Sequence, residues 1–311
     1  MANTFAGMSH TNIAQRGFTI FLKKLVRIVG TFSTDFSSDV AEQGTVVQTR
    51  TIPARTAQDL VSDHSGNYNT AADVDITTSA VSVTLDNHLT DGFYSTDKER
   101  AAVARGVWQD TIERNLLVSA NAVAVGFHDM VINKIVAASF ASSFDAIASA
   151  NVDSDTLAAW RGVLVKADFD PDETNLFLHT DIITALHQDN AIQDFSASQD
   201  NVQSSGNLNP KEGMGIFEDA RLPPAAGAAA GENLTGFAAT PDAMMVAMRA
   251  TTTQGQRHFD AYIPMTDDKT GATLLYTSWF DTETRKQRHL FECLCGAAKG
   301  NGAALYRVKS A

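Results

Sequence analysis

A strand, a long polar loop, a second strand and one very long helix follow each other between Gly44 and Ala138. The first strand lies in GTVVQTRTIPA, and the loop covers roughly residues 58–78. The loop is rich in Ser, Asn, Asp, Thr and Gly and lacks the apolar positions that an independent core needs. A loop of this length requires a partner or a function. The order therefore predicts a hairpin arm that leaves the body of the protein, which a compact enzyme domain rarely has.

The strand that returns from this loop alternates apolar and polar side chains. The apolar positions are Val81, Val83 and Leu85, and the polar ones are Ser82, Thr84 and Asp86. Because successive side chains of a strand point to opposite faces, this pattern predicts a strand that is half buried.

A long helix is predicted to follow the hairpin. Thr96 and Glu99 form a capping-box pattern, and Asp97 places negative charge at the positive end of the helix. Apolar residues then recur at intervals of three, four or seven, as one buried stripe of a straight helix demands. They are Trp108, Ile112, Leu116, Val123, Phe127, Met130, Val131 and Ile135. Unbroken from 97 to 138, the helix would span about 60 Å at 1.5 Å per residue.

The second half of the chain alternates helical and strand-like segments. Ser154 is expected to cap a helix that ends near Lys166, and Thr180 to cap another after the apolar strand NLFLH. Residues 196–215 are polar, and 222–233 have the composition of a flexible loop. Strands are expected in LTGFAAT, in TPDAMMVAMRA and around residues 258–265, 272–280 and 288–295. The pattern predicts an α/β layer followed by a closing sheet.

The N-terminal segment has the apolar spacing of a helix that packs against something. Its apolar residues are Ile13, Phe18, Phe21, Leu22, Leu25, Val26 and Val29. Lys23, Lys24 and Arg27 interrupt the segment before a membrane span of about twenty residues can form. We therefore expect a soluble, cytoplasmic product without a membrane partner.

Charge is spread unevenly over the 311 residues, whose net charge is -12. Residues 1–34 carry Arg16, Lys23, Lys24 and Arg27 and no acid, and residues 285–311 are also basic. The middle of the chain therefore holds the acidic excess. Basic ends suit contact with a polyanion or an acidic partner. Chance clustering on solvated faces is the alternative.

The residues that bear catalytic or metal chemistry do not form a recognisable site. Cys293 and Cys295 lie two apart in a predicted strand, where a mutual disulfide would be strained. We expect reduced thiols, because a lone C-x-C lacks the further ligands of a zinc site.

The run Asp168, Asp170 and Asp172 begins like the calcium loop of an EF-hand. Glu173 stands where that loop requires glycine and His179 where it requires a bidentate acid. An acidic turn that caps a strand is predicted instead.

His179, Asp181 and His187 surround a predicted helix start and are candidates for an acid/base or metal site. No H-E-x-x-H, G-x-S-x-G, Walker A or G-x-G-x-x-G pattern accompanies them. We predict no enzymatic activity, no catalytic residues, no metal and no cofactor. The basic ends lack the signatures of sequence-specific nucleic-acid binding, which leaves weak, salt-sensitive phosphate contact open.

Three segments and the long helix between them carry a resemblance to a known family. They are FSSDVAEQGTVVQTRTIPARTAQDL, SVTLDNHLTDGFYSTDKER and LTGFAATPDAMMVAMRA. In this order, from about Ile28 onward, the chain resembles the major capsid (coat) proteins of tailed phages, which have the Hong Kong 97-type fold. The resemblance implies an α+β fold with five parts. These are an N-arm at 1–45, an extended E-loop hairpin at 46–92, a P-domain with the spine helix at 93–154, an α/β A-domain at 155–255 and closing P-domain strands at 256–311.

The resemblance also implies a structural role in a virion capsid that is assembled in the host cytoplasm. Subunits would form pentamers and hexamers and then an icosahedral shell around double-stranded DNA, with a separate scaffolding protein and a portal protein as partners. In this fold the E-loop lies across a neighbouring subunit, which makes Asp63, His64, Asn67 and Tyr68 candidates for inter-subunit contact. The basic residues Arg16, Lys23, Lys24 and Arg27 become candidates for facing the lumen, toward acidic scaffold or DNA.

Three alternatives to the capsid interpretation stay open at this point. An encapsulin-type nanocompartment shell has the same fold and encloses a cargo enzyme. A tail or decoration protein would form rings, tubes or trimers. A soluble α/β hydrolase would use His179, Asp181 and His187.

Overall fold

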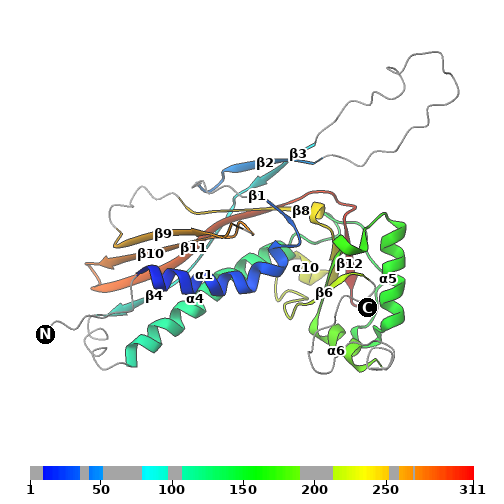
Figure 1. The fold of residues 1–311 in the computed structure, drawn as a ribbon, viewed down its shortest axis with the longest axis horizontal. Helices are drawn as coiled ribbons and strands as arrows, with labels where there is room; N and C mark the ends of the chain where they lie inside the picture. Colours follow the sequence, from blue (N-terminus) through cyan, green and yellow to red (C-terminus); the bar gives the residue numbers. More distant parts are fainter. Residues whose placement is uncertain are drawn as a thin grey trace, which may run out of the picture.

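The computed structural model describes residues 10–35, 42–51, 79–96, 107–189, 213–251, 259–268 and 270–311. Its helices are α1 (His10–Val29), α4 (Val107–Ile132), α5 (Ser154–Lys166), α6 (Thr180–Gln188) and α10 (Ala228–Gly231). Its strands are β1 (Ser33–Asp35), β2 (Val46–Thr51), β3 (Ser79–Thr84), β4 (Asn87–Thr96), β5 (Asn175–Leu178), β6 (Gly215–Glu218), β7 (Leu234–Ala239), β8 (Met244–Arg249), β9 (Ala261–Thr266), β10 (Thr273–Asp281), β11 (Lys286–Lys299) and β12 (Leu305–Lys309). Figure 1 shows a body of two sheets with helices, from which the β2–β3 hairpin projects.

β11 is the centre of a six-stranded sheet. It pairs antiparallel with β10 along residues 286–292, with β8 along 294–299 and with β4 along 286–295. Because Cys295 pairs with both Met248 and Asn87, β8 and β4 lie on opposite edges of β11. β9 adds to β10 and the short parallel β1 adds to β8. The predicted closing sheet is confirmed, whereas the addition of β4 to it was not predicted.

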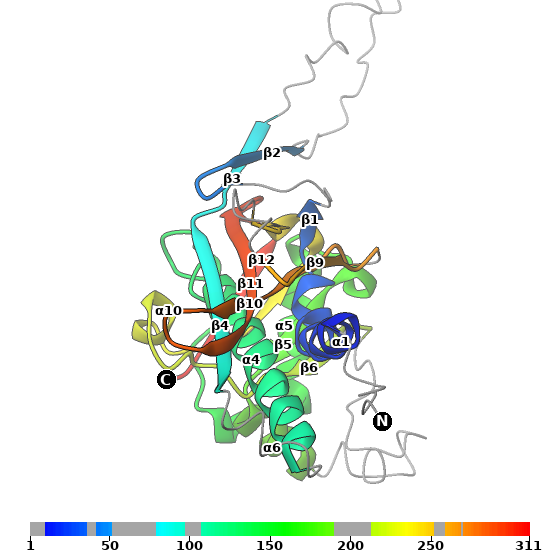
Figure 2. The same ribbon diagram turned by 90° about the vertical axis from the view of Figure 1, so that its left-hand side faces the viewer.

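α1 and α4 pack together against this sheet (Figure 2). The largest buried side chains between them and the sheet are Phe21, Leu25, Ile28, Phe127, Ile132, Ile135, Tyr276 and Phe291. The predicted N-terminal helix and its buried face are thus confirmed. The stretch Arg114–Ile132 of α4 is long and apolar enough to cross a membrane, but in this fold its stripe around Phe127 fills the core.

α4 ends at Ile132, so the prediction that the helix continues to residue 138 is wrong. The amides of Lys134 and Ile135 bond to carbonyls only three residues back, at 3.1 and 2.8 Å, which tightens the last turn. The amide of Ala137 leaves the helix path and donates to the carboxylate of Glu232 at 2.8 and 2.9 Å. The predicted start of the helix is not tested, because residues 97–106 lie outside the described part of the chain.

β2 and β3 form the predicted antiparallel hairpin, in register from Val46 opposite Thr84 to Thr51 opposite Ser79. Val83 and Leu85 are buried against β8 and β11, and the polar positions between them are exposed, as the alternation predicted. The hairpin crosses β11 where a Cβ on Gly296 would collide with the carbonyl of Thr84. Only glycine permits this close approach of two backbones.

The second sheet has the order β12-β7-β5-β6, with β5 parallel to β6 and antiparallel to β7. α5 and α6 cover it through a separate apolar core. Leu157, Trp160, Leu164, Leu176, Leu178, Ile182 and Leu186 are its central residues. This is the predicted α/β layer.

The predicted caps of α5 and α6 are each wrong by one residue. The Asp153 side chain accepts from the amide of Thr156 at 2.8 Å, and Nδ1 of His179 accepts from the amide of Asp181 at 3.2 Å. Asp153 and His179 have extended backbones that let their side chains reach back over the first turn. Ser154 and Thr180 are therefore the first residues of the helices.

Residues 222–233 are exposed along most of their length, as their composition predicted, but the segment is anchored to the body at three buried positions, 222, 224 and 229. Leu222 and Ala229 are fully buried, and the segment contains α10. Glu232 at its end is bound to the amide of Ala137 and to Arg307.

Candidate assembly surfaces and a polar joint

The four basic residues proposed from the sequence lie together on the solvent side of α1. Arg16, Lys23 and Arg27 are seven and four residues apart, a spacing that puts them on one stripe of a helix. Lys24 lies beside this stripe, and all four side chains are exposed. The apolar residues of α1 face the main sheet instead.

Three of the four basic residues line a cleft of about 380 Å³ between α1, α4 and the segment after β6. The members are Lys23, Lys24, Arg27, Ile28, Ala124, Val125, His128, Phe177, Glu218, Asp219, Ala220 and Arg221. The guanidinium of Arg27 lies 5.6 Å from the centre of the Phe217 ring. Thr31 accepts a hydrogen bond from Asn175 of β5 at 3.1 Å, which ties the end of α1 to the second sheet. Basic residues therefore form the wall of the cleft that α1 contributes.

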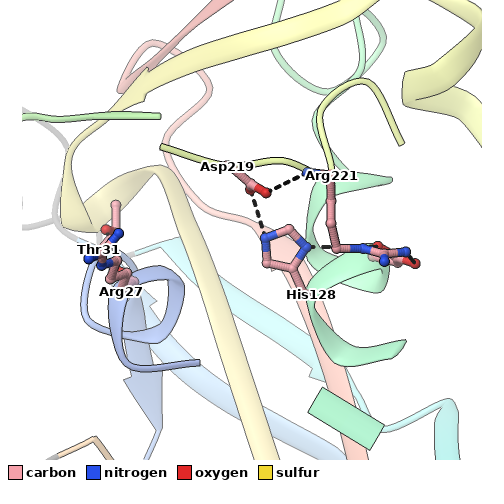
Figure 3. Close-up of polar contacts among 6 residues, drawn as sticks. Arg27, Thr31, His128, Asp219 and Arg221 are labelled. Carbon is pink, nitrogen blue, oxygen red and sulfur yellow. Dashed lines mark hydrogen bonds and ion pairs between the residues drawn. The ribbon is translucent and has the colours of Figure 1, made fainter. Parts of the chain in front are cut away.

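Four residues, three of which line this cleft, connect α4 to the segment after β6 (Figure 3), and we call them the polar joint. They are His128, Asp129, Asp219 and Arg221. Nε2 of His128 lies 2.7 Å from Oδ2 of Asp219. Arg221 donates twice to the Asp129 carboxylate, at 2.7 Å and 2.5 Å, and its amide donates to Asp219 at 2.9 Å. The joint fixes the edge of the second sheet to the long helix.

The sequence reasoning missed the polar joint. Its one local signal is His128, a polar residue beside Phe127 in the apolar stripe of the helix. No pattern in the sequence connects that position to Asp219, ninety-one residues later.

Burial alone would raise the pKa of Asp219, whose side chain is 8% exposed. The contact with His128 and the hydrogen bond from the Arg221 amide outweigh burial, so the pKa of Asp219 is lowered. A lowered pKa means that the carboxylate stabilises the folded state at any pH above its unfolded value of about 4. This contribution is lost as the pH falls through the lower, folded value.

Replacing Asp219 with Asn is expected to lower the free energy of unfolding by about 1–3 kcal/mol at neutral pH, because His128 loses a buried anionic partner. Urea unfolding between neutral and acidic pH measures the effect. The difference from the wild type should begin to shrink below about pH 4, where this carboxyl is protonated in the unfolded chain, and should be lost as the pH falls through the lower pKa of the folded state. The exposed neighbour Glu218, changed to Gln, is the control. An equal loss for both variants, or a difference independent of pH, would contradict this role of Asp219.

The structure brings His179 and Asp181 together, with Nδ1 of His179 3.3 Å from Oδ2 of Asp181, but His187 does not join them. Nδ1 of His179 is occupied as the cap of α6, and Asp181 is 74% exposed. His187 lies eight residues further along α6, about 12 Å away at 1.5 Å per residue. In the described ranges no group of three or more His, Cys, Asp or Glu could hold a metal ion. The hydrolase alternative therefore gains no geometric support.

The acidic run at 168–172 forms the turn that its sequence predicted. Asp170 accepts from the amide of Asp172 at 3.0 Å and caps the short 3-10 helix Pro171–Glu173 before β5. Cys293 and Cys295 are free and fully buried on β11. Their mutual contact, together with burial, raises the pKa of Cys293, so its thiol is protonated at neutral pH.

The inter-subunit candidates Asp63, His64, Asn67 and Tyr68 lie outside the described residues. The structure describes the two strands that lead to them. Apart from their contacts near Val83 and Leu85, those strands project away from the body (Figures 1 and 2).

No protein-family model matches the chain, and no curated protein matches it significantly. Solved structures do match along most of its length. The mature capsid of bacteriophage PhiM1 aligns with a TM-score of 0.57 and 13% identity, covering 90% of this chain and 86% of that one. The capsid of cyanophage P-SCSP1u gives 0.56 and 13%, with the same coverage. A structure from Mycobacterium phage Che8 gives 0.55 and 15%, covering 86% and 88%.

The chain therefore has the fold of phage capsid proteins. The match covers 86–90% of the chain in these three comparisons. The resemblance to tailed-phage major capsid proteins that was inferred from three short segments is confirmed at the level of the fold.

Proposed function

We propose that this chain is the major capsid protein of a tailed phage or a related particle. Its subunits assemble through pentamers and hexamers into an icosahedral shell that encloses double-stranded DNA, and it is located in the virion after assembly in the host cytoplasm. The observation that carries the proposal is the β2–β3 hairpin, whose described residues pack on the body near its base, around Val83 and Leu85. A two-stranded ribbon is barely stable by itself, so a neighbouring subunit is the natural support for it.

The parts of the Hong Kong 97-type fold can be proposed for the observed elements. α1 belongs to the N-arm at 1–45, and β2 and β3 belong to the E-loop at 46–92. The P-domain contains α4 at 93–154 and the closing strands β9–β12 at 256–311, and the A-domain at 155–255 contains α5, α6 and β5–β8. In this proposal Asp63, His64, Asn67 and Tyr68 contact the neighbouring subunit.

The proposed activity is assembly, without catalysis or a cofactor. Many weak contacts repeated by symmetry make a closed shell far more stable than any single contact. A separate scaffolding protein and a portal protein are the proposed partners, and DNA is contacted without sequence preference. The basic side of α1 faces the lumen in this scheme, where Arg16, Lys23, Lys24 and Arg27 meet acidic scaffold or DNA.

Electron microscopy with sedimentation tests the proposal. The protein is produced alone and with its candidate scaffold at moderate salt, and we expect closed shells, or pentamers and hexamers that convert into shells. A discrete monomer or dimer under both conditions would refute the capsid function. Rings, tubes or trimers would indicate a tail or decoration protein, and a copurifying cargo enzyme in place of DNA would indicate a nanocompartment.

A further inference from the structure

The cleft beside α1 has more cationic groups than its own acidic residues neutralise. Asp219 is engaged by His128 and by the Arg221 amide, and the Arg221 side chain is engaged by Asp129. Lys23, Lys24 and Arg27 form no ion pair within the described part of the chain, and the remaining acid of the cleft is the exposed Glu218. The wall formed by α1 is therefore suited to an anionic ligand.

The floor of the same cleft is apolar. Ile28 and Phe177 are 2% and 3% exposed, and Val125 of α4 is half-buried beside them. A volume of about 380 Å³ accommodates large side chains of a ligand. A DNA backbone would bring charge to this cleft without any apolar group to cover the floor.

We propose that this cleft binds an acidic peptide segment of a partner protein, which inserts an apolar side chain against Ile28 and Val125. The carboxylates that flank this side chain then lie against Lys23, Lys24 and Arg27. The inference rests on the proposed function, because it describes how a separate assembly partner contacts the subunit. It selects an acidic peptide over DNA as the ligand of these basic residues.

Fluorescence anisotropy with the full-length purified protein provides the test. The probes are a labelled peptide with Glu and Leu at helical spacing, the same peptide with each Leu replaced by Ser, and a short DNA duplex. We expect the Leu peptide to bind at least about tenfold more tightly than the Ser peptide, since burying one Leu side chain stabilises by about 1.5–3 kcal/mol. Binding should weaken as salt is raised.

Variants assign the binding to the cleft. Lys23→Gln with Lys24→Gln is expected to weaken binding of the Leu peptide about tenfold, because two cations leave the wall. Val125→Ser should weaken binding of the Leu peptide and leave binding of the Ser peptide unchanged. The matched control, Lys134→Gln with Lys166→Gln, removes the same charge from exposed positions outside the cleft and should change nothing.

Two results would overturn the inference. In the first, both peptides and the duplex bind with equal affinity, and the Lys23/Lys24 variant and the Lys134/Lys166 control weaken binding equally. This result would indicate a surface that binds polyanions without specificity. The other is no binding of the Leu peptide at low salt. Shell formation is scored separately by microscopy, so shells without peptide binding would refute only this inference, and peptide binding without shells would refute only the proposed function.

Discussion

Replacing Glu232 with Ala is expected to lower the free energy of unfolding by about 3 kcal/mol, since it leaves a buried guanidinium without its partner. The Arg307 side chain is 4% exposed and its Nη1 is bound to Oε2 of Glu232. The same carboxylate accepts the amide of Ala137 just beyond α4. The Glu232 side chain thus joins three parts of the fold. They are the end of the long helix α4, the residues that follow α10, and the strand β12.

Urea or thermal unfolding of the purified subunit measures this effect. Glu232→Gln should lower the free energy of unfolding less than Glu232→Ala does, because the side-chain amide oxygen of Gln can still accept a hydrogen bond from the amide of Ala137. Combining Glu232→Gln with Arg307→Met should recover part of the loss, because no buried charge remains. Glu218→Gln, at an exposed site, is the control for loss of a carboxylate. Wild-type stability of both Glu232 variants would show that this pair does not hold the elements together.

Replacing residues 47–81 with a short Gly-Ser linker is expected to abolish shell formation and leave the subunit folded. Thr45 and Leu85 are hydrogen-bonded at 3.0 Å across the base of the hairpin, so the shortened chain can close there. Val83 and Leu85 keep their buried positions. Within the described residues the removed parts of β2 and β3 pair only with each other, and the apolar contact that is lost is that of the partly buried Val47 and Val81 with the cluster around Val83 and Leu85.

Circular dichroism and thermal unfolding check the fold of this variant, and electron microscopy with sedimentation checks its assembly. A companion variant keeps the hairpin at full length but has residues 52–78 in scrambled order. If it assembles, the paired strands carry the contact between subunits; if it does not, the sequence of the loop is needed as well. Closed shells formed by the shortened chain would contradict the role of the hairpin in assembly.

Elements with a strong local pattern were predicted from the sequence. The helical spacing around Phe21 and Leu25 identified α1, and the alternation at Val81, Val83 and Leu85 identified the return strand with its buried face. Apolar periodicity reports burial on one side of a single element, so it needs no knowledge of the partner. The order of these elements was sufficient to indicate the phage capsid fold.

Details at the ends of elements were predicted less well. Any of several neighbouring polar residues can cap a helix, so the sequence alone does not fix the capping residue. Asp153 and His179 are the caps because their backbones are extended, whereas Ser154 and Thr180 already belong to the helices. The long helix stops at Ile132, and the amide of Ala137 beyond it donates to Glu232, a residue ninety-five positions away. The apolar stripe itself continues to Ile135, so periodicity overestimated the length.

The sequence by itself determined the longer helices and strands, but not β1, β6, β12 or α10, and it determined which faces of α1 and β3 are apolar and that the basic residues of α1 share one side. Only the tertiary structure decided that β4 joins β11, that His128 meets Asp219, and that Lys23, Lys24 and Arg27 border a cleft with an apolar floor. The physical reason is the range of the interactions. Periodicity arises from neighbours along one element, whereas strand partners, ion pairs and clefts arise between segments that only the folded chain brings together.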